Sequence, residues 1–327
     1  MKLTVNDVLS SYDIVVEKGI LSKVNDYLNV DKKVLIVSDS NIPSSYYLDT
    51  FKDFTNLFIV IIKAGEKSKN YKNYLKVVDT LIKNHFANDD YIVTVGGGVV
   101  GDLGGFVAST FKRGIKWINI PTSTIAIIDS SIGGKVAIDY KGVKNALGNF
   151  YNHELVLIDF DVLHTLPQRQ FYNGLFEALK IGYLYNKSII EDIENDIFVN
   201  LENIIVKSLK AKIMIVEKDF YCKNLRHQLN FGHTFGHALE SYFKFSSKLY
   251  HGEAIGYGMR YVVSRKLLSQ LDKHLELLHL PSIPEVSKDK LFKFIMDDKK
   301  IKNNKIRLIT LSEVNVIKEK YVSIEKL

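Results

Sequence analysis

Four short apolar segments in the first half of the chain limit its fold more than any other feature. They span Val34–Ser38, Leu57–Lys63, Tyr91–Val95 and Lys116–Ile120. Between the second and third, Asn70–Phe86 has apolar residues spaced at about 3.6 positions, which is typical of a helix. Continuous apolar strands that alternate with helices form a mainly parallel sheet covered on both faces. The sequence therefore predicts an N-terminal α/β domain.

The second half has a different pattern, because helical spacing dominates from about Pro167 onward. We place the domain boundary near residue 160, which divides the chain into 1–160 and a mainly α-helical domain at 161–327. A chain of 327 residues has the length of two ordinary domains. The predicted helices are Phe171–Tyr185, Ile189–Phe198, Leu201–Glu217, Asn230–Phe243, Gly252–Gln270 and Lys288–Asp297, followed by a strand pair at Ile306–Leu311 and Val314–Lys318.

Composition narrows the cellular setting and the partners. The single cysteine, Cys222, excludes an internal disulfide and favours a reducing compartment. The N-terminus lacks the apolar core of a signal peptide, and no apolar run is long enough to span a bilayer, so we expect a cytoplasmic protein without a membrane partner. The net charge of +7 is spread along the chain without a nucleic-acid-binding motif, which favours a small anionic ligand over nucleic acid.

A glycine-rich loop follows the strand at Tyr91–Val95. Gly96, Gly98 and Gly101 fit the pattern G-x-G-x-x-G, which lets a backbone turn approach a pyrophosphate at a helix N-terminus. The acidic residue expected about 20 positions downstream is missing, and Asp39 is a candidate for the ribose contact instead. A tight turn without a ligand is the alternative interpretation.

A second polar loop follows the strand at Lys116–Ile120. It contains Pro121–Thr124 and, after a short apolar stretch, Asp129–Lys135 with paired glycines and a lysine. Hydroxyls, glycines and a lysine suit a phosphate-bearing ligand. Helix capping is the alternative, and it accounts adequately for Thr122–Thr124 but less well for Gly133–Lys135.

Histidines and a carboxylate suggest a metal site in the second half. His233 and His237 are four residues apart, on one face of a predicted helix, and His251 opens the next segment. Glu177 and Lys180 share a face of an earlier helix. Two histidines and one carboxylate would leave an open position on Zn²⁺, as catalysis requires. Each histidine taken alone is more often structural than a ligand, and the peptidase motif His-Glu-x-x-His is absent.

Several of these segments together resemble the 3-dehydroquinate synthase family. The matches occur in family order between about residues 34 and 311, and their combination is specific. They are Gly65–Lys69, Gly96–Gly114, Pro121–Ala137, the pair Glu177 and Lys180, Asn230–Glu240, His251–Glu253 and Asp298–Lys300.

The resemblance implies a fold, a reaction and an assembly. The fold is an NAD-binding α/β domain followed by a mainly helical metal domain, with the active site in the cleft between them, in a homodimer. The reaction converts 3-deoxy-D-arabino-heptulosonate 7-phosphate to 3-dehydroquinate and phosphate, in the shikimate pathway of aromatic amino acid biosynthesis. It proceeds by transient oxidation with NAD, phosphate elimination, re-reduction and an intramolecular aldol closure.

The resemblance also implies roles for individual residues. Glu177, His233 and His251 are the expected ligands of one Zn²⁺ or Co²⁺. Residues expected to contact NAD are Asp39, Asn41, Glu66, Lys69, Gly97, Gly98, Val99, Val100, Gly101, Asp102, Thr122, Ser123, Lys135, Lys144, Val162, Leu163, His164 and Thr165. Substrate contacts and catalysis are expected from Asp129, Lys135, Lys144, Asn145, Lys180, Lys212, Arg226, Asn230, His237 and one of Lys299 or Lys300, with Arg113 reaching the phosphate pocket of a neighbouring subunit.

Some positions depart from the family pattern. Cys222 stands where an acidic residue is usual, and Asn224 replaces a glycine whose left-handed conformation asparagine can adopt. His153 replaces a proline, and the loop Lys141–Asn145 is altered. These departures bear on substrate fit and rate rather than on fold.

Three other functions fit parts of the pattern. A different sugar phosphate cyclase, such as 2-deoxy-scyllo-inosose synthase, acts on a substrate without a carboxylate, whereas Lys212 and Arg226 favour a carboxylated one. A metal-dependent polyol dehydrogenase would release NADH and would not need so many basic residues. A non-catalytic NAD-binding protein would not need all three metal ligands.

Overall fold

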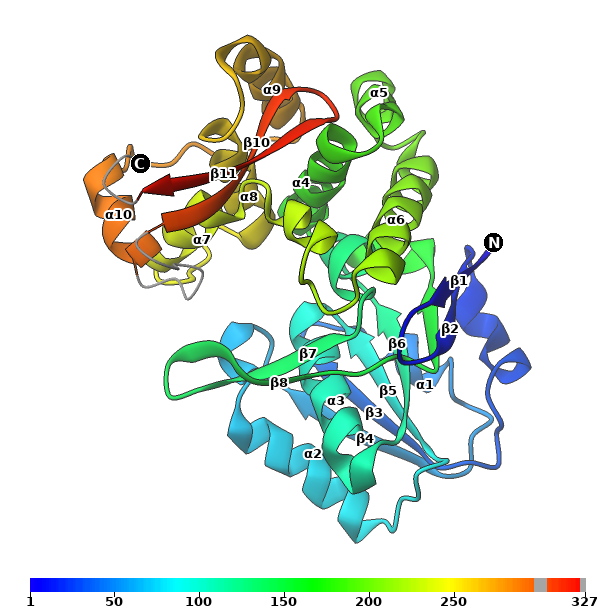
Figure 1. The fold of residues 1–327 in the computed structure, drawn as a ribbon. Coiled ribbons are helices and arrows are strands. Elements are labelled where there is room, and N and C mark those ends of the chain that lie inside the picture. The colour runs from blue at the N-terminus through cyan, green and yellow to red at the C-terminus, as the bar shows by residue number, and fades with distance from the viewer. Residues whose placement is uncertain (297–304, 324–327) are drawn as a thin grey trace. The chain divides into compact units, whose positions relative to one another are not determined.

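The computed structural model describes residues 1–296 and 305–323 (Figure 1). The chain divides after Pro167 into two compact units. The first is an α/β unit built on one large sheet, and the second is mainly helical with a terminal hairpin. This is the fold class that the sequence predicts.

The sheet of the first unit has seven strands in the order β1-β2-β9-β6-β5-β3-β4. All neighbours pair in parallel except β1 and β2, which are antiparallel. The four predicted strands form its centre and one edge. The other three strands were not predicted, and two of them are short strands near the N-terminus with mixed polar and apolar residues. The strands are β1 Lys2–Asn6, β2 Ser11–Val16, β3 Val34–Asp39, β4 Leu57–Ile62, β5 Tyr91–Gly96, β6 Lys116–Pro121 and β9 Leu155–Ile158.

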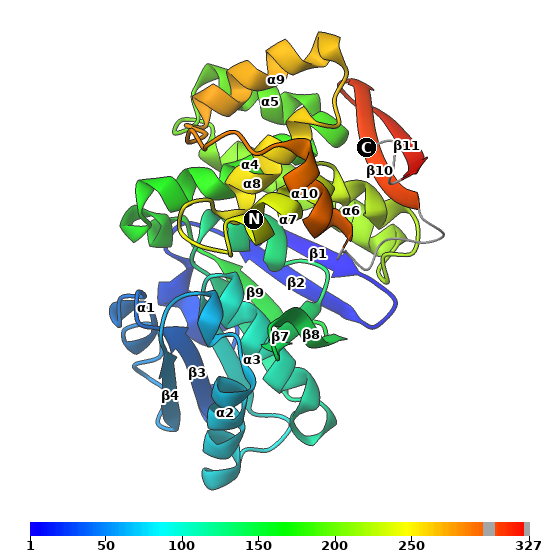
Figure 2. The same ribbon diagram turned by 90° about the vertical axis from the view of Figure 1, so that its left-hand side faces the viewer.

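Helices α2 (Tyr71–Lys83) and α3 (Gly98–Thr110) cover one face of this sheet, and the short α1 (Ser45–Leu48) lies on the other (Figure 2). A hairpin of β7 (Lys135–Tyr140) and β8 (Val143–Phe150) packs beside α3. The core between them is mainly apolar, and its buried Thr94 hydroxyl accepts a 2.9 Å hydrogen bond from the Trp117 indole N–H and donates to Asn119 Oδ1 at 2.9 Å. This packing fixes the carboxyl ends of β5 and β6, where both predicted ligand loops begin.

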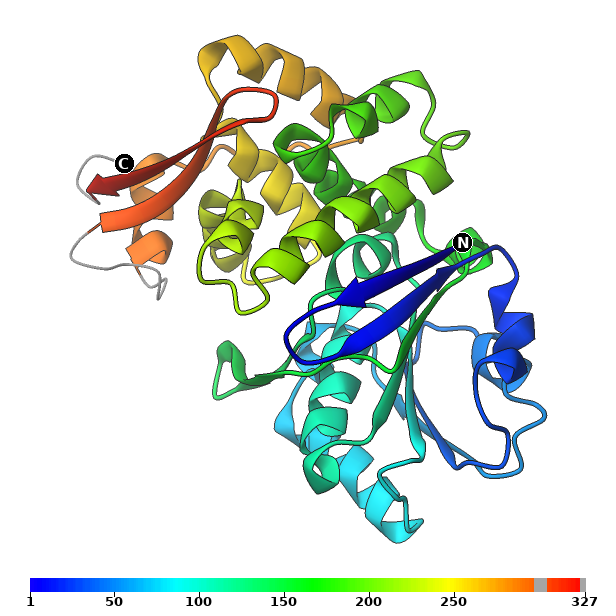
Figure 3. The same cartoon turned by 45° about the vertical axis from the view of Figure 1, so that its right-hand side comes forward.

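The second unit contains seven helices within its described residues and a hairpin that lies beside them (Figure 3). The helices are α4 Gln168–Leu184, α5 Lys187–Asn195, α6 Leu201–Lys218, α7 His233–Tyr242, α8 His251–Arg260, α9 Arg265–Leu277 and α10 Lys288–Met296, and the hairpin strands are β10 Lys305–Glu313 and β11 Val316–Ser323.

Two predicted helices were wrong in extent. The helix expected at Gly252–Gln270 is two helices, because Val263 pairs with Leu311 of β10 and Ser264 accepts a hydrogen bond from the Leu267 N–H to start α9. The helix expected from Asn230 begins only at His233, after a left-handed Gly232 with φ of 77°. The break before α7 makes the predicted metal ligand His233 the first residue of that helix.

Candidate metal and cofactor sites

Three histidines gather at the start of α7 and α8. His233 and His251 are the first residues of their helices, and His237 lies one turn further along α7. One ring nitrogen from each lies within 4.8 Å of the others. The two helices approach closely, since a Cβ added at Gly258 would lie 1.9 Å from the Gly232 carbonyl oxygen. Only glycine at this crossing allows the histidines to converge.

Glu177 of α4 completes this cluster. Its Oε1 lies 3.9 Å from His233 Nε2 and 3.8 Å from His251 Nε2. These separations are close to the ~3.4 Å between two ligand atoms on one tetrahedral metal ion. The carboxylate is fully buried and forms an ion pair with Lys180, yet neither oxygen accepts a hydrogen bond from the described residues. A buried carboxylate in this condition suits a bound cation.

In both candidate histidine ligands, the Nδ1 atom has a hydrogen-bond partner. His233 Nδ1 lies 3.2 Å from the Phe231 carbonyl oxygen, and His251 Nδ1 lies 3.1 Å from Glu240 Oε2. A neutral ring that donates from Nδ1 carries its acceptor lone pair on Nε2, and such outer partners are usual for metal-bound histidines. The donor set therefore fits a divalent metal ion of the zinc type. This role of Glu240 was not predicted, although its position seven residues after His233 puts it on the same face of α7.

The other predicted residues of the second unit lie in two segments. Lys212 is buried on α6, and the Arg226 guanidinium donates from Nη1 to the Phe220 carbonyl oxygen at 2.6 Å. Asn230 ends a short 3₁₀ turn, where its amide donates to the His227 carbonyl oxygen at 3.1 Å. Lys299 and Lys300 lie outside the described residues.

The turn before Arg226 corrects one expectation. Asn224 has a φ of −137°, so it does not adopt the left-handed conformation, whereas Cys222 does, with a φ of 57°. The Asp219 carboxylate holds this turn by accepting the backbone N–H groups of Lys223, Asn224 and Arg226 at 2.7 to 2.9 Å. The turn thus depends on Asp219 and not on a residue suited to positive φ.

In the first unit, α3 begins directly in the glycine-rich loop. Gly97 is its N-cap and no side chain caps it, which leaves a helix N-terminus of the kind that binds phosphate. The Thr122 N–H donates to the Gly96 carbonyl oxygen at 2.9 Å, so the second loop starts beside the first. Ser123 accepts a weak hydrogen bond from the Ala126 N–H at 3.3 Å, so the alternative of helix capping also holds there.

Five predicted residues of the first unit form one network around Lys69. The Lys69 ammonium, only 5% exposed, lies 2.8 Å from Asp102 Oδ2 and 2.6 Å from the Asn145 side-chain oxygen. Glu66 Oε1 lies 3.5 Å from both Lys69 Nζ and Lys144 Nζ. Burial alone would lower the pKa of Lys69, but Asp102 and Glu66 outweigh it and raise that pKa. The network keeps Lys69 charged and joins residues expected at the cofactor and at the substrate.

The remaining predicted residues of this unit lie at several places in it. Asp39 ends β3, where it accepts the Asn41 N–H at 2.8 Å, and burial raises the pKa of its carboxyl group. The Thr165 hydroxyl hydrogen-bonds the Tyr46 hydroxyl at 2.7 Å. Val162, Leu163 and His164 share a 3₁₀ turn with Thr165. Asp129 lies in a short π-helical turn, and Lys135 is the first residue of β7. Arg113 is exposed beyond the end of α3.

Two family models match consecutive parts of the chain. The model described as 3-dehydroquinate synthase N-terminal matches residues 59–173, and the model described as 3-dehydroquinate synthase C-terminal matches residues 174–301.

Curated relatives match over nearly the whole chain. A 3-dehydroquinate synthase of Clostridium kluyveri is 37% identical over 332 residues, which cover 94% of this chain and 92% of the relative. A 3-dehydroquinate synthase of Streptococcus pyogenes is also 37% identical, over 99% of this chain and 98% of the relative.

Solved structures share the fold. A 2-deoxy-scyllo-inosose synthase complexed with carbaglucose-6-phosphate, NAD⁺ and Co²⁺ has a TM-score of 0.87 at 24% identity, with 100% of this chain and 98% of that chain covered. A 2-epi-5-epi-valiolone synthase of Streptomyces hygroscopicus with NAD⁺ and Zn²⁺ bound has a TM-score of 0.83 at 24% identity, with 95% and 92% covered.

Proposed function

The chain belongs to the 3-dehydroquinate synthase family and has that family's lyase activity, and we propose which of its residues carry the reaction out. They are the cluster around Glu177 in the second unit and the network around Lys69 in the first. The reaction converts 3-deoxy-D-arabino-heptulosonate 7-phosphate to 3-dehydroquinate and phosphate. The observation that carries the proposal is the convergence of Glu177, His233 and His251 on one point within the second unit.

We assign these three side chains to one divalent metal ion, Zn²⁺ or Co²⁺. Such an ion, together with NAD, supplies polarisation of a substrate oxygen and reversible hydride transfer. Lys180 places a positive charge beside Glu177, and His237 adds a ring nitrogen within the same cluster. We assign both to the substrate, where a lysine attracts its anionic groups and a histidine can hold or move a proton of its hydroxyl.

In the first unit, the Lys69 network and the α3 N-terminus support NAD binding. A helix N-terminus without a side-chain cap attracts the pyrophosphate, and the ion pairs of Lys69 with Glu66 and Asp102 join three residues expected to contact NAD. Lys144 and Asn145 belong to the same network, which supports their assignment to the substrate.

Buried cations in the second unit favour an acidic substrate over a neutral polyol. Lys180, Lys212 and Arg226 are each at most 4% exposed. Lysine and arginine side chains at a binding site hold phosphate and carboxylate anions by charge-assisted hydrogen bonds. A substrate with a phosphate and a carboxylate provides such anions, whereas a polyol does not. The relatives at 37% identity are 3-dehydroquinate synthases, and the other cyclases share the fold at 24%.

The role of NAD provides the test. Because the hydride leaves and returns within one turnover, substoichiometric NAD⁺ should support complete conversion of the heptulosonate phosphate. We expect equal amounts of phosphate and dehydroquinate, with no net accumulation of NADH. NADH that accumulates in proportion to the substrate consumed, without phosphate release, would show a dehydrogenase instead.

Assembly and location are part of the proposal. We infer a homodimer, in which Arg113 serves the neighbouring subunit, and a cytoplasmic enzyme, for which the single cysteine is the support. In the part of the chain that the structure describes, no helix is long and apolar enough to cross a membrane.

A further inference from the structure

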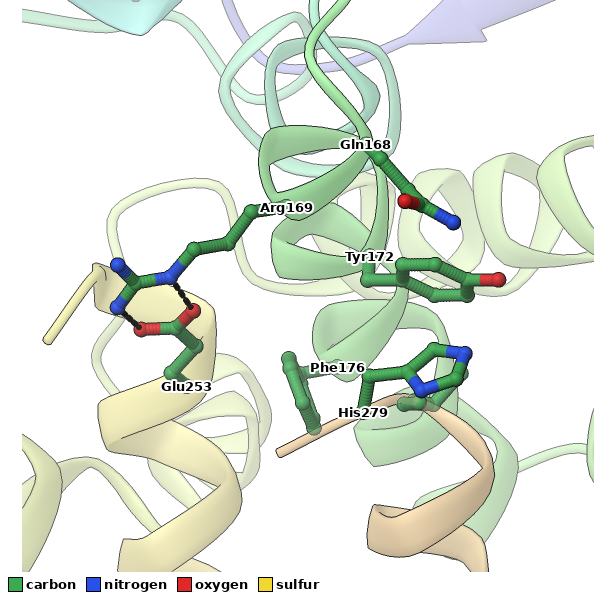
Figure 4. Close-up of a pocket in the computed structure, with 7 residues that line it drawn as sticks. Gln168, Arg169, Tyr172, Phe176, Glu253 and His279 are labelled. Carbon is green, nitrogen blue, oxygen red and sulfur yellow. Dashed lines mark hydrogen bonds and ion pairs between the residues drawn. The ribbon is translucent and has the colours of Figure 1, made fainter. Parts of the chain in front are cut away.

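The first turn of α8 is held in place by two side chains of α4. The Arg169 guanidinium donates from Nε to Glu253 Oε1 at 2.6 Å and from Nη2 to Glu253 Oε2 at 2.8 Å (Figure 4). Glu253 is only 2% exposed. A bidentate arginine–carboxylate pair fixes both distance and orientation, which a single ion pair does not.

Asn173, one turn after Arg169 on α4, holds the same helix start. Its Oδ1 accepts the N–H groups of Gly252 at 2.7 Å and of Glu253 at 3.3 Å. Glu253 Oε2 in turn accepts the Tyr250 N–H at 2.8 Å. The N–H groups at a helix start have no partner within the helix, so α4 satisfies donors that would otherwise need water.

Helix α4 lies so close to the start of α8 that no side chain fits between them at Gly252. A Cβ added at Gly252 would lie 1.8 Å from the Asn173 carbonyl oxygen. Arg169 also donates to the carbonyl oxygens of Ser247 at 2.9 Å and Lys248 at 3.0 Å, and its guanidinium lies 4.5 Å from the centre of the Tyr250 ring. Both the chain entering α8 and the first turn of α8 are thus fixed to α4.

His251 lies between Tyr250 and Gly252, in the middle of this contact, and Glu177 lies two turns along α4 from Arg169. Resting on the metal assignment proposed above, we propose that Arg169 and Asn173 are positioning residues for the metal site. They set the distance between His251 Nε2 and Glu177 Oε1, although neither side chain belongs to the donor set. With Glu253 they form what we term the α4–α8 latch.

The latch can be reached from solvent. The Arg169 side chain is 44% exposed and lines a pocket of about 220 Å³, with Tyr172 and His279 across from Glu253 (Figure 4). Removal of the arginine side chain would therefore leave a space that a guanidinium ion can enter from solvent. Added guanidinium could therefore restore the function of an Arg169 variant whose defect lies at this contact. It would not restore a variant that has simply failed to fold.

The test is the binding of Co²⁺ to the full chain, measured by competition with a chelator and by the visible absorption of the bound ion. We expect Arg169→Ala to bind Co²⁺ at least about tenfold more weakly, the scale seen for outer-shell partners, with an altered absorption spectrum. Added guanidinium should restore both. Arg169→Lys should remain defective, because one ammonium cannot engage both oxygens of Glu253.

Arg260→Ala is the matched control. Arg260 lies at the other end of α8 and also donates from Nε to a carboxylate, Asp272 Oδ1, at 2.8 Å, but this pair is about 40% exposed. Its loss should leave Co²⁺ binding unchanged. Asn173→Ala should weaken binding and Asn173→Asp should not, since aspartate keeps an acceptor oxygen at the helix start.

The variants separate failure of the metal assignment from failure of the latch proposal. If Glu177→Ala and His251→Ala bind Co²⁺ as tightly as the parent chain, the metal assignment is wrong, and the latch proposal fails with it. If those variants lose Co²⁺ but folded Arg169→Ala and Asn173→Ala keep the parent affinity and spectrum, only the latch is refuted. A loss in Arg169→Ala that guanidinium does not reverse would also count against it.

Discussion

At the scale of single residues, His153 has an environment that histidine rarely tolerates. Its ring stacks on Trp117 at 3.8 Å between centroids and lies 5.2 Å from Tyr12. Neither ring nitrogen has a hydrogen-bond partner among the described residues. Burial lowers the pKa of His153 from 6.5 to about 3, because the charged form would lose its hydration without any compensation.

This environment predicts a loss of stability in mild acid. Between about pH 6.5 and pH 3 the unfolded chain binds a proton at His153 that the folded chain does not, so stability falls as the pH falls through that window. His153→Phe keeps an aromatic ring but cannot titrate. From about pH 8 to about pH 5, the parent chain should lose about 2 kcal/mol more unfolding free energy than this variant, as measured by urea denaturation.

His85→Asn is the control for that measurement. His85 is exposed and has a φ of 54°, a conformation that asparagine accepts. Its replacement should leave the pH dependence of the parent chain unchanged. Equal pH dependence in His153→Phe and the parent chain would show that His153 does not limit stability in acid.

Single residues also show which parts of the candidate site could be predicted from the sequence. Histidines and a carboxylate suggested a metal site from their types and spacing, and the structure brings His233, His251 and Glu177 together. Glu240 and the latch residues were missed, because their roles depend on contacts across helices that no local pattern encodes. The conformation of Cys222 and Asn224 was misjudged for a similar reason, since Asp219 determines the turn.

At the scale of elements, the α7–α8 crossing depends on a missing side chain. Because a Cβ at Gly258 would overlap the Gly232 carbonyl oxygen, Gly258→Ala must separate the two helices. We expect a loss of about 3 kcal/mol in unfolding free energy, the upper part of the usual range for overpacking. Thermal and urea denaturation would measure it, and Co²⁺ affinity should fall as His233 and His251 separate.

Gly101→Ala is a matched control for this effect on stability. Gly101 is also a helical glycine, but the nearest atom to an added Cβ, Asn119 Oδ1, is 3.8 Å away. Alanine should therefore be neutral there or stabilise the fold by up to about 1 kcal/mol. If both variants lose equal stability, helix propensity or a general sensitivity to substitution, and not the crossing, would explain the result.

Among the elements, those with continuous apolar runs could be predicted and those that depend on distant partners could not. The strands at Val34–Asp39 and Tyr91–Gly96 lie at the centre of a sheet, and their composition alone identifies them. The break between α8 and α9 follows from the pairing of Val263 with Leu311, which lies 48 residues further along the chain. The hairpin β7–β8 was likewise missed, because β8 is mostly exposed and only the short stretch Val136–Ile138 of β7 is buried.

At the scale of the whole molecule, the position of Arg113 suggests a role in a second subunit. Helix α3 ends at Thr110, and Lys112 and Arg113 then adopt left-handed conformations with φ of 48° and 69°. Two consecutive residues of this kind are costly, and such strain is often kept for a function. Thirteen residues of helix, about 20 Å at 1.5 Å per residue, separate this turn from the glycine-rich loop.

A residue at the far end of α3 cannot reach a phosphate bound at its start, so we expect exposed Arg113 to serve the site of a second subunit. Arg113→Ala and Lys135→Ala should each be nearly inactive alone. In mixed dimers, one of the two sites has both side chains intact, because the first variant supplies Lys135 and the second supplies Arg113. Random exchange of equal amounts should therefore restore about one quarter of the parent activity, as symmetry requires if each site uses one arginine from its partner. Exchange would be verified by native mass spectrometry with one variant isotopically labelled. A mixture whose activity stays at the sum of its components, with mixed dimers present, would place Arg113 outside the partner's site, and a chain that remains monomeric while fully active would exclude a shared site altogether.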